Sequence, residues 1–291
     1  QQLGMRAESV HRNGCPPVRI EGGLPFGGRT QLRCKLSSQY LSALLLTAPF
    51  AEKPVEIVVT EGPVSRPYID LTLEVMENFG IAVQRQGYDY FRIEPGQRYR
   101  AGDYTVEADH SQAGYFWAAA AITGGSVAVQ GTRRRSRQGD ARFVDCLAAM
   151  GCNVESESDG IRVTGRPLKA ITVDMADMPD MVPTMAVTAA FAEGTTVIEN
   201  VAHLRAKESN RLEAVAAELA KMGIRTKVGE TSLAVTGGSP HGAEIETYND
   251  HRIAMSFALA GLKTPGVKIT GEECVKKSFP NFWEVFASLY K

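Results

Sequence analysis

The sequence predicts an α/β protein built from repeats of strand–helix–strand–helix–strand–strand, each about seventy residues long. Three observations predict this fold class. Four helix-like segments end in a glycine at intervals of 71 to 76 residues, at Gly4, Gly80, Gly151 and Gly223. Each glycine precedes a β-branched or alternating run and then a second alternating run, which is typical of two strands. Midway between the glycines, a polar residue opens an Ala- or Leu-rich helix that leads into a Val-rich strand.

The predicted elements recur in the same order along the chain. Strand pairs are expected at 5–10 with 18–20, 81–85 with 90–93, 152–155 with 160–163, and 224–228 with 232–235. Helix-then-strand segments are expected at 38–59, 109–129, 179–198 and 249–269. A further helix opens near Leu204, with apolar residues at three- and four-residue spacing up to Met222, and a final helix is expected at 277–291.

The repeats do not coincide with the ends of the chain. Residues 1–4 resemble the end of a helix, and no strand pair follows the final helix. We therefore expect 1–107 to be the remnant of a first domain, with the tail of one repeat and one complete repeat. Residues 108–291 are expected to form a second domain of three repeats, the last of which lacks its final strands.

The composition is that of a globular protein without strong charge. The chain has 291 residues, 44% of them apolar, and a net charge of −1, so it is long enough for two domains, and we expect no nucleic-acid or membrane partner. Five cysteines without a Cys-x-x-Cys pair suit reduced thiols in a cytosolic protein better than disulfides or a zinc site. The apolar runs fall short of the roughly 20 residues that span a bilayer, and no signal peptide opens the chain, so we expect a cytoplasmic protein.

The start of the helix near Leu204 carries the wrong charge. A helix N-terminus is partially positive and favours Asp or Glu, yet Arg205, Lys207 and Arg211 surround it, with Glu208 as the one acidic residue. Lys207 and Arg211 are four residues apart, where like charges destabilise a helix by about 0.2–0.5 kcal/mol. The pattern predicts a bound anion, and the structural alternative is a solvated helix end with a weak Glu208–Arg211 pair.

Two further predicted helix starts repeat this pattern. Arg252 follows the N-cap candidates Asn249 and Asp250, where its charge again opposes the helix dipole. The Lys276-Lys277 pair comes just before the final predicted helix. Each cluster alone has a structural explanation as a cap or as solvated side chains, but their joint occurrence favours a site for anions.

Hydroxyl groups mark two more helix starts. Ser37 and Ser38 precede the Leu-rich helix together with Gln39, and a second start lies at 65–68. Free backbone N–H groups at such a start suit a phosphate, although serine also caps helices without any ligand. Asp180 opens another predicted helix, either as a plain N-cap or as a carboxylate that accepts a proton beside an anion.

Other motifs have structural explanations. The Gly-rich stretch 22–28 is a turn-rich connector rather than a phosphate loop, because no helix follows it directly. The arginine run at 133–137 is interpreted as a solvated loop, because the overall charge is balanced and no aromatic residues are interleaved. His251 is the one histidine within the clusters above, and no His, Cys, Asp and Glu set has metal-ligand spacing, so we expect no metal.

These clusters carry a resemblance to a known family. The matching strings lie at 37–39, 64–70, 138–140, 179–180, 207–211, 248–252 and 277–280. In these strings, and in their order over essentially the whole chain, the sequence resembles the 5-enolpyruvylshikimate-3-phosphate synthase (EPSP synthase) family. The resemblance implies the two-domain enolpyruvyl-transferase architecture, an inside-out α/β barrel with three repeats per domain, of which one domain is truncated here.

The resemblance also implies an activity. The family transfers the enolpyruvyl (carboxyvinyl) group of phosphoenolpyruvate to the 5-hydroxyl of shikimate 3-phosphate and releases phosphate through a tetrahedral intermediate. It belongs to the shikimate pathway, which leads to chorismate and the aromatic amino acids, and it is the target of glyphosate. We expect no cofactor, and the complete enzyme is expected to be a monomer.

The family's roles carry over to matching residues. Shikimate 3-phosphate is expected to contact residues of both domains, namely Ser37, Ser38, Gln39, Ser65, Tyr68, Asp180 and Lys207. Phosphoenolpyruvate is expected to contact Gln39, Arg211, Asp250, His251, Arg252 and Lys277. Asp180, Lys207 and Glu208 are the expected catalytic residues. Asp180 would act as base toward the attacking oxygen, Lys207 would contact the substrate hydroxyls, and Glu208 would exchange a proton with the methylene carbon of phosphoenolpyruvate.

The sequence departs from the family in two respects. His203 stands where some members carry an Asn that touches the substrate, and we leave it out of the site. The family's N-terminal Lys-Ser…Arg motif, Gly-Asn-Ala-Gly loop and Arg-Pro segment have no counterpart, so a complementing N-terminal segment is expected as a partner. Two alternatives stay open: an enolpyruvyl transferase that acts on UDP-N-acetylglucosamine, against which 207–211 and 249–252 speak, and a non-catalytic fragment that binds phosphate groups.

Overall fold

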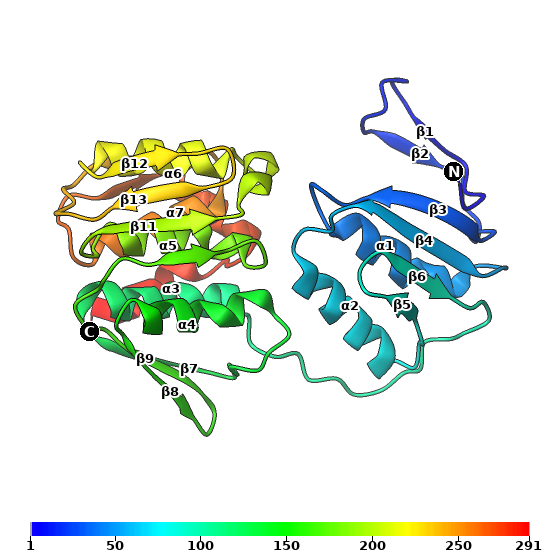
Figure 1. The fold of residues 1–291 in the computed structure, drawn as a ribbon, viewed down its shortest axis with the longest axis horizontal. Helices are drawn as coiled ribbons and strands as arrows, with labels where there is room; N and C mark the ends of the chain where they lie inside the picture. The colour runs from blue at the N-terminus through cyan, green and yellow to red at the C-terminus, as the bar shows by residue number, and fades with distance from the viewer. Residues whose placement is uncertain (1, 291) are drawn as a thin grey trace. The chain divides into compact units, whose positions relative to one another are not determined.

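The computed structural model describes residues 2–290 and contains two compact parts, drawn in Figure 1. The N-terminal part covers Gln1–Thr105, and the C-terminal part covers Val106–Lys291. This division lies close to the boundary between 107 and 108 that the repeats led us to expect. Each part has its own hydrophobic core, so each is described by itself.

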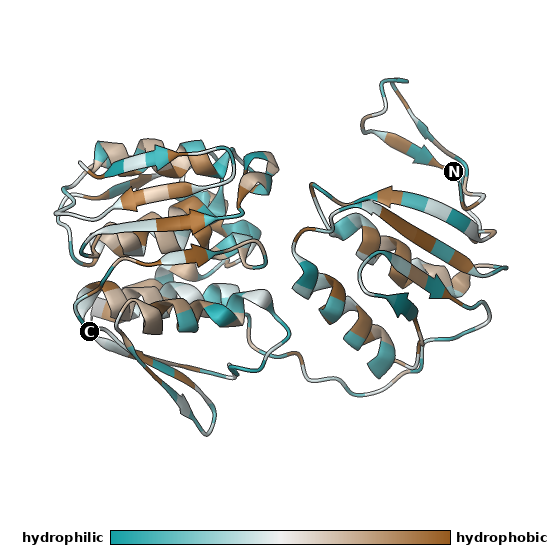
Figure 2. Cartoon of the chain, viewed as in Figure 1, coloured by the Kyte–Doolittle hydropathy of each residue, from teal (hydrophilic) through white to brown (hydrophobic). Residues whose placement is uncertain are grey.

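The N-terminal part contains one complete copy of the predicted repeat. Its elements are β3 (Gly28–Arg33), α1 (Gln39–Thr47), β4 (Val55–Glu61), α2 (Arg66–Asn78), β5 (Gln84–Gln86) and β6 (Tyr90–Ile93). The sheet order is β3-β4-β6-β5, with β3 parallel to β4 and the other neighbours antiparallel. Alternate residues Val55, Ile57 and Val59 of β4 are buried, as expected for a strand with one face in the core, and Figure 2 shows its apolar colouring.

A short antiparallel hairpin, β1 (Ala7–Ser9) and β2 (Val18–Ile20), precedes this copy. Apolar side chains near the hairpin stay exposed, among them Ile20, Leu24 and Phe50. These three residues line one apolar hollow of about 700 Å³ in the N-terminal part. An exposed apolar surface of this kind is typical of a face that another segment or protein covers.

The C-terminal part contains three further copies, of which the first and last are shortened. The first copy comprises α3 (His110–Thr123), β7 (Ser126–Gln130), α4 (Phe143–Ala149), β8 (Asn153–Glu157) and β9 (Gly160–Thr164). The second comprises β10 (Thr172–Asp174), α5 (Val182–Ala189), β11 (Thr195–Glu199), α6 (Arg211–Lys221), β12 (Arg225–Val228) and β13 (Leu233–Thr236). The third comprises β14 (Glu244–Glu246), α7 (His251–Gly261), β15 (Lys268–Thr270) and α8 (Phe282–Ala287).

The second of these copies has the same topology as the copy in the N-terminal part. Its sheet order is β10-β11-β13-β12, with β10 parallel to β11 and antiparallel pairing elsewhere, which matches β3-β4-β6-β5 strand for strand. The predicted α/β class of repeated βαβαββ units is therefore confirmed. The first copy has a three-stranded sheet β7-β9-β8, because residues 94–109 form no strand ahead of α3, and the last has the parallel pair β14-β15.

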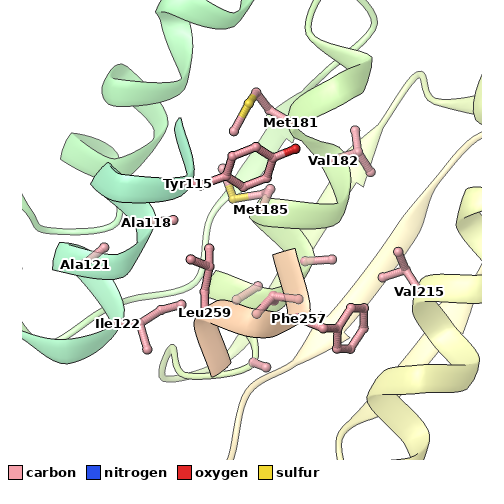
Figure 3. Packing of buried hydrophobic residues seen from close by; sticks show 14 of the residues in the cluster. Tyr115, Ala118, Ala121, Ile122, Met181, Val182, Met185, Val215, Phe257 and Leu259 are labelled. Carbon is pink, nitrogen blue, oxygen red and sulfur yellow. The ribbon is translucent and has the colours of Figure 1, made fainter. Parts of the chain in front are cut away.

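Helices α3, α5 and α7, one from each copy, pack together in the core of the C-terminal part (Figure 3). The alanines of α3 let the helices approach closely, and a Cβ on Gly114 would lie 2.2 Å from Cε of Met181, so that side chain would have to move. The hydroxyls of Thr184 and Ser256 share a buried hydrogen bond of 2.9 Å that joins α5 to α7. A helix that is surrounded by protein on all sides is apolar around its whole circumference, which explains why apolar residues dominate the sequences of α3, α5 and α7.

Two predicted helix boundaries are wrong. The final helix, expected at 277–291, is much shorter among the described residues: Lys277 ends a 3₁₀ helix (Glu272–Lys277) and α8 begins only at Phe282. Pro280 explains the gap, since proline disfavours helical backbone in the residue before it. The helix expected to open near Leu204 begins instead at Arg211, after a 3₁₀ helix (Ala202–Ala206).

Three further features bear on the class of protein. All five cysteines are free thiols, and burial raises the pKa of the Cys146 thiol to about 12, so this thiol is unreactive at neutral pH. No helix within residues 2–290 has the length and apolar character needed to cross a membrane. In the same range, no three His, Cys, Asp or Glu side chains are grouped so that they could hold a metal ion.

Candidate active site

Parallel strand pairs place the predicted residues of the C-terminal part at common sheet edges. Strands β10 and β11 are parallel, as are β14 and β15, so the loops that follow each pair leave the sheet at the same edge. Asp180 follows β10 and Arg211 follows β11, whereas Asp250 follows β14 and Lys277 follows β15. The repeated topology thus brings residues far apart in sequence to the ends of neighbouring strands.

Arg211 is the centre of an ion-pair network in the C-terminal part. It is the first residue of α6, and its side chain is only 1% exposed. Its Nε donates to Asp250 Oδ2 at 2.8 Å, and its Nη1 donates to Asp180 Oδ1 at 2.8 Å. Its Nη2 donates to Glu208 Oε2 at 2.8 Å and to Asp250 Oδ1 at 3.3 Å. Burial by itself would lower the pKa of Arg211, but the charges of Asp180 and Asp250 outweigh it and raise the pKa above its ordinary value.

Arg252 extends the network from the first turn of α7. Asp250 caps this helix by accepting a hydrogen bond from Arg252 N at 3.0 Å. The Arg252 side chain donates to Asp180 Oδ2 and to the hydroxyl of Tyr115, both at 3.1 Å. Arg252 Nε and His251 Nδ1 are buried and have no hydrogen-bond partner among residues 2–290. Buried nitrogens without a hydrogen bond are uncommon in proteins, although His251 Nδ1 lies 3.8 Å from Asp250 Oδ1.

Lys277 closes the network by donating from Nζ to Glu208 Oε1. Its side chain is 55% exposed, against 27% for Glu208, so this pair lies at the solvent edge while Arg211 lies inside. Lys207 acts on the network through its charge, which lowers the pKa of Asp180. Together with Asp250 and Arg252, the predicted residues of the described C-terminal part amount to four cations and three carboxylates. Lys207 is the fourth cation, and the six residues joined by ion pairs carry three positive and three negative charges.

The structure brings the predicted charged residues together and corrects one interpretation of them. Six of them form the network: Asp180, Glu208, Arg211, Asp250, Arg252 and Lys277. The Glu208–Arg211 pair of the structural alternative exists, but a solvated helix end is wrong, because Arg211 is buried against three carboxylates. The misplaced charge that suggested an anion thus has partners within the chain, and the binding roles of these residues stay predictions.

Two carboxylates of the network are held ionised. Burial by itself would raise the pKa of Glu208, but the hydrogen bond from Lys277 and the charge of Arg211 outweigh it and lower the pKa to about 2. Burial is likewise outweighed at Asp180, where Arg252 and Arg211 hold the pKa below its ordinary value. Both groups are therefore proton acceptors rather than donors in the structure as it stands.

Two buried histidines are held neutral. Burial, with a smaller contribution from the charge of Lys207, lowers the pKa of His203 to about 4. Burial and the charge of Arg252 lower the pKa of His251 to about 4 as well. The Nε2 atom of His203 is also without a hydrogen-bond partner in the part of the chain that the structure describes.

We expect the C-terminal part to lose stability as the pH falls from 7 to 5. The unfolded chain protonates its histidines near pH 6.5, but folded His203 and His251 do so only near pH 4, so the unfolded state binds more protons in this window. Each histidine should contribute a loss on the order of 2 kcal/mol. The carboxyl group of Asp140, whose pKa is raised to about 7, opposes this by a similar amount because only the folded state takes up its proton in this window, so the net loss should correspond to about one histidine. Trp117 and Trp283 are the only tryptophans of the chain, so urea unfolding followed by tryptophan fluorescence reports on this part. A His203→Gln variant with the same pH dependence as the parent would contradict the expectation.

The predicted residues of the N-terminal part form a second group. Ser38 and Ser65 hold the N-cap positions of α1 and α2, and neither makes a side-chain cap hydrogen bond. Their loops are joined, because Val64 N donates to Cys34 O at 3.2 Å where the parallel strands β3 and β4 end. Ser65 is buried with a left-handed φ of +55°, and its Oγ has no partner within the described residues. Strain at a serine with an unsatisfied hydroxyl is typical of a binding site.

The remaining residues of this group lie beside these serines. Ser37 Oγ accepts a hydrogen bond from Gln39 N at 3.2 Å, so Ser37 rather than Ser38 satisfies a free N–H at the start of α1. The side chain of Gln39 is exposed, and Tyr68 is half-buried in the first turn of α2. A hydrogen bond of 2.8 Å between Ser42 and Thr72 joins the two helices one turn further on.

Two contacts of the network escaped the sequence analysis. Tyr115 is fully buried and bonds Arg252, but within an Ala-rich helix a tyrosine is indistinguishable from core. Ser209 Oγ donates to Asp250 Oδ2 at 3.0 Å. Its position inside the matching string 207–211 was an available signal.

Asp140 is a further carboxyl group that sequence reasoning did not assign. It is almost fully buried, and its Oδ2 accepts a hydrogen bond from Ser111 Oγ. Burial first, and then the charge of Asp180, raise its pKa to about 7, so it exchanges a proton near neutral pH. The matching string 138–140 was the one signal that pointed to it.

Comparison with known proteins agrees with this geometry. The EPSP synthase family, described as 3-phosphoshikimate 1-carboxyvinyltransferase, matches residues 1–286. A relative of that name from Methanoculleus marisnigri is 48% identical over 97% of this chain and 67% of its own length, and one from Syntrophobacter fumaroxidans is 43% identical over 99% and 69%. The structure of EPSP synthase from Acinetobacter baumannii matches with a TM-score of 0.82 and 31% identity over 98% of this chain and 68% of its own. The chain thus spans about two thirds of the length of these proteins, and it belongs to the EPSP synthase family.

Proposed function

We propose that this chain transfers the enolpyruvyl group of phosphoenolpyruvate to the 5-hydroxyl of shikimate 3-phosphate and releases phosphate. The name that its relatives carry, 3-phosphoshikimate 1-carboxyvinyltransferase, describes this transfer. In the addition step the hydroxyl oxygen bonds to C2 of phosphoenolpyruvate while C3 gains a proton. In the elimination step C3 loses a proton and the bond from C2 to the phosphate oxygen breaks. The network around Arg211 is the observation that best supports the proposal, because it combines fixed cations with carboxylates that can move protons.

Arg211, Arg252 and Lys277 are the proposed ligands of phosphoenolpyruvate. Its carboxylate and phosphate require several fixed cations, and a low-dielectric site strengthens each contact. The nitrogens Arg252 Nε and His251 Nδ1, unpartnered within residues 2–290, support this assignment. Asp250 supports it indirectly, because it holds Arg211 in place, and Gln39 of the N-terminal part is the further predicted contact.

Glu208 is the proposed carrier of the proton for the methylene carbon. Its pKa of about 2 leaves it ionised, so it cannot donate a proton while Lys277 and Arg211 both hold it. An anionic substrate that draws the exposed Lys277 toward itself removes the hydrogen bond that lowers this pKa most. Binding of phosphoenolpyruvate would thus raise the pKa of Glu208 and prepare it as the acid of the addition step.

Asp180 is the proposed base toward the 5-hydroxyl, with Lys207 beside it as a contact to the substrate hydroxyls. Asp180 Oδ1 stays on Arg211, while Oδ2 is bonded to the less buried guanidinium of Arg252. A substrate anion that competes for Arg252 would release Oδ2 to accept a proton. The same binding event would therefore prepare the acid and the base.

The N-terminal part is proposed to bind shikimate 3-phosphate. Ser37, Ser38 and Ser65 would hold its phosphate, with Gln39 and Tyr68 beside its ring. The support is the buried hydroxyl of Ser65, which has no hydrogen-bond partner within the described chain, and the position of Ser38 and Ser65 at the starts of two neighbouring helices.

A complementing N-terminal segment is proposed as a partner of this chain. The apolar hollow lined by Ile20, Leu24 and Phe50 supports it, because exposed apolar side chains grouped in this way suit contact with another segment. We further propose a monomer once that segment is present, no nucleic-acid partner, and a cytoplasmic location, which the five free thiols support.

Phosphate release tests the proposal. We expect the chain, mixed with the N-terminal third of the Methanoculleus marisnigri relative, to release phosphate from phosphoenolpyruvate only when shikimate 3-phosphate is present. Shikimate 3-phosphate, but not UDP-N-acetylglucosamine, should also raise the melting temperature of the mixture, since a ligand stabilises the state that binds it. Binding without turnover would favour the non-catalytic alternative, and full activity of the chain alone would refute the need for a second segment.

A further inference from the structure

The turn that leads into Asp250, the fully buried carboxylate of the network, is strained. Tyr248 and Asn249 have φ angles of +53° and +54°, in a left-handed region that residues other than glycine rarely adopt. They join β14 to Asp250, which caps α7 and binds Arg211. Two consecutive residues in this conformation persist only where the surrounding structure holds them.

Helix α6 holds this turn at two points. Arg211 in its first turn binds Asp250, as described above. Glu218 lies seven residues later, on the same side of the helix, and is fully buried. Its Oε1 accepts a hydrogen bond from the Tyr248 hydroxyl at 2.8 Å, and its Oε2 accepts one from Glu246 N at 3.0 Å. Three alternate residues of the segment 246–250 are thus bonded to one face of α6.

We propose that Glu218 is a positioning residue. Through the hydroxyl of Tyr248 it holds Arg211 and Arg252, the proposed ligands of phosphoenolpyruvate, in place. The bond fixes the left-handed turn, the turn fixes Asp250, and Asp250 fixes the guanidinium of Arg211 and the first turn of α7, which carries Arg252. Catalytic groups displaced by a fraction of an ångström lose much of their effect. The inference rests on the proposed function, because it assigns those arginines to phosphoenolpyruvate.

Two observations support a specific rather than a general structural role. Burial, and then the hydrogen bond to Glu218, raise the pKa of Tyr248 to about 12, so the hydroxyl keeps its proton and remains a donor. Lys221 also pairs with Glu218, at 2.8 Å, but its side chain is partly exposed and contacts β14 rather than the turn. Lys221 therefore provides a control that removes a partner of Glu218 without touching the positioning bond.

The test compares Tyr248→Phe, Glu218→Met and the double variant with Lys221→Met. Each of the first two should lower kcat/KM for phosphoenolpyruvate about tenfold or more, and the double variant should be no worse than the poorer single one, because both remove the same bond. Lys221→Met keeps the bond between Tyr248 and Glu218 and should lower kcat/KM less than either of these variants. Unchanged kcat/KM in Tyr248→Phe, or effects that multiply in the double variant, would overturn the proposal.

Amide hydrogen exchange gives a second readout that needs no activity. Tyr248→Phe should speed exchange in the segment 247–252 at least tenfold while leaving the amides of β11 and β13 unchanged, whereas Lys221→Met should leave 247–252 protected. Protection of 247–252 that survives Tyr248→Phe would overturn the inference even if the parent is active. A parent that neither binds nor turns over phosphoenolpyruvate, with exchange behaving as expected, would refute the proposed function and leave the anchoring of the turn by Glu218 standing.

Discussion

Glu208→Gln is expected to lower kcat by a factor of about 10² to 10⁴ while the KM for phosphoenolpyruvate changes by less than about threefold. The amide keeps the shape of the side chain, but its single oxygen can accept a hydrogen bond from only one of the two donors, Arg211 and Lys277. It also cannot carry the proton that C3 must gain and lose. Removal of the negative charge also leaves both cations freer for the substrate. Steady-state phosphate release at varied phosphoenolpyruvate concentration separates the two parameters.

Glu213→Gln is the matched control for this experiment. Glu213 lies in the first turn of α6, five residues after Glu208, but its partner is the partly exposed Arg205, at 3.1 Å, and it takes no part in the network. Its kcat and KM should both match those of the parent, because an exposed pair of this kind contributes little. If Glu208→Gln kept more than about a tenth of the parent kcat, the assignment of Glu208 as proton carrier would be wrong.

The repeat could be predicted from the sequence because one backbone requirement marks each copy. The glycines at 4, 80, 151 and 223 all have φ between 79° and 111°, a left-handed conformation that glycine adopts without steric penalty. Selection for this residue type at the ends of equivalent helices leaves a periodic signal. Strand pairs after each glycine follow from local alternation, so the order of elements was visible without any tertiary information.

Helix starts were harder to predict because several caps compete over short distances. Asn210 caps α6 by accepting from Glu213 N, which places the start at Arg211 rather than near Leu204. The charge pattern alone gave no means of choosing between these two starts. At the C-terminal end, Pro280 delays α8, although the same residue also fits the first turn of a helix that begins earlier.

The residue types of the site could be predicted from the sequence, but the pairing of these side chains with one another could not. Charges at helix starts pointed to Arg211, Arg252 and Lys277, and the structure places all three in one network. Except for the Glu208–Arg211 pair, which is three residues apart, their carboxylate partners lie far away in the sequence, in the same copy of the repeat or in another, so no spacing rule connects them. The left-handed backbone of Ser65 could not be predicted from the sequence either, because serine, unlike glycine, rarely adopts this conformation.

Arg211→Met is expected to destabilise the C-terminal part by about 3–5 kcal/mol. The substitution keeps much of the side-chain volume but leaves Asp250, which is fully buried, with its charge uncompensated, and it removes one partner each from Asp180 and Glu208. Urea unfolding followed by tryptophan fluorescence measures the loss in this part of the chain. Arg205→Met, which breaks a partly exposed pair nearby, should cost less than about 1 kcal/mol.

The pH dependence of this loss distinguishes an electrostatic cause from poorer packing. With Arg211 present, Glu208 has a pKa of about 2 against an ordinary value of 4.5, so its pairing stabilises the fold above pH 4.5 and that stabilisation disappears as the pH falls toward 2. Without Arg211 the pKa of Glu208 should rise, and less stability remains to be lost on acidification. The difference in unfolding free energy between parent and variant should therefore narrow below pH 4.5. A difference that stays constant down to the acid transition would mean that the arginine stabilises the fold by filling space, and that the network is not held together by its charges.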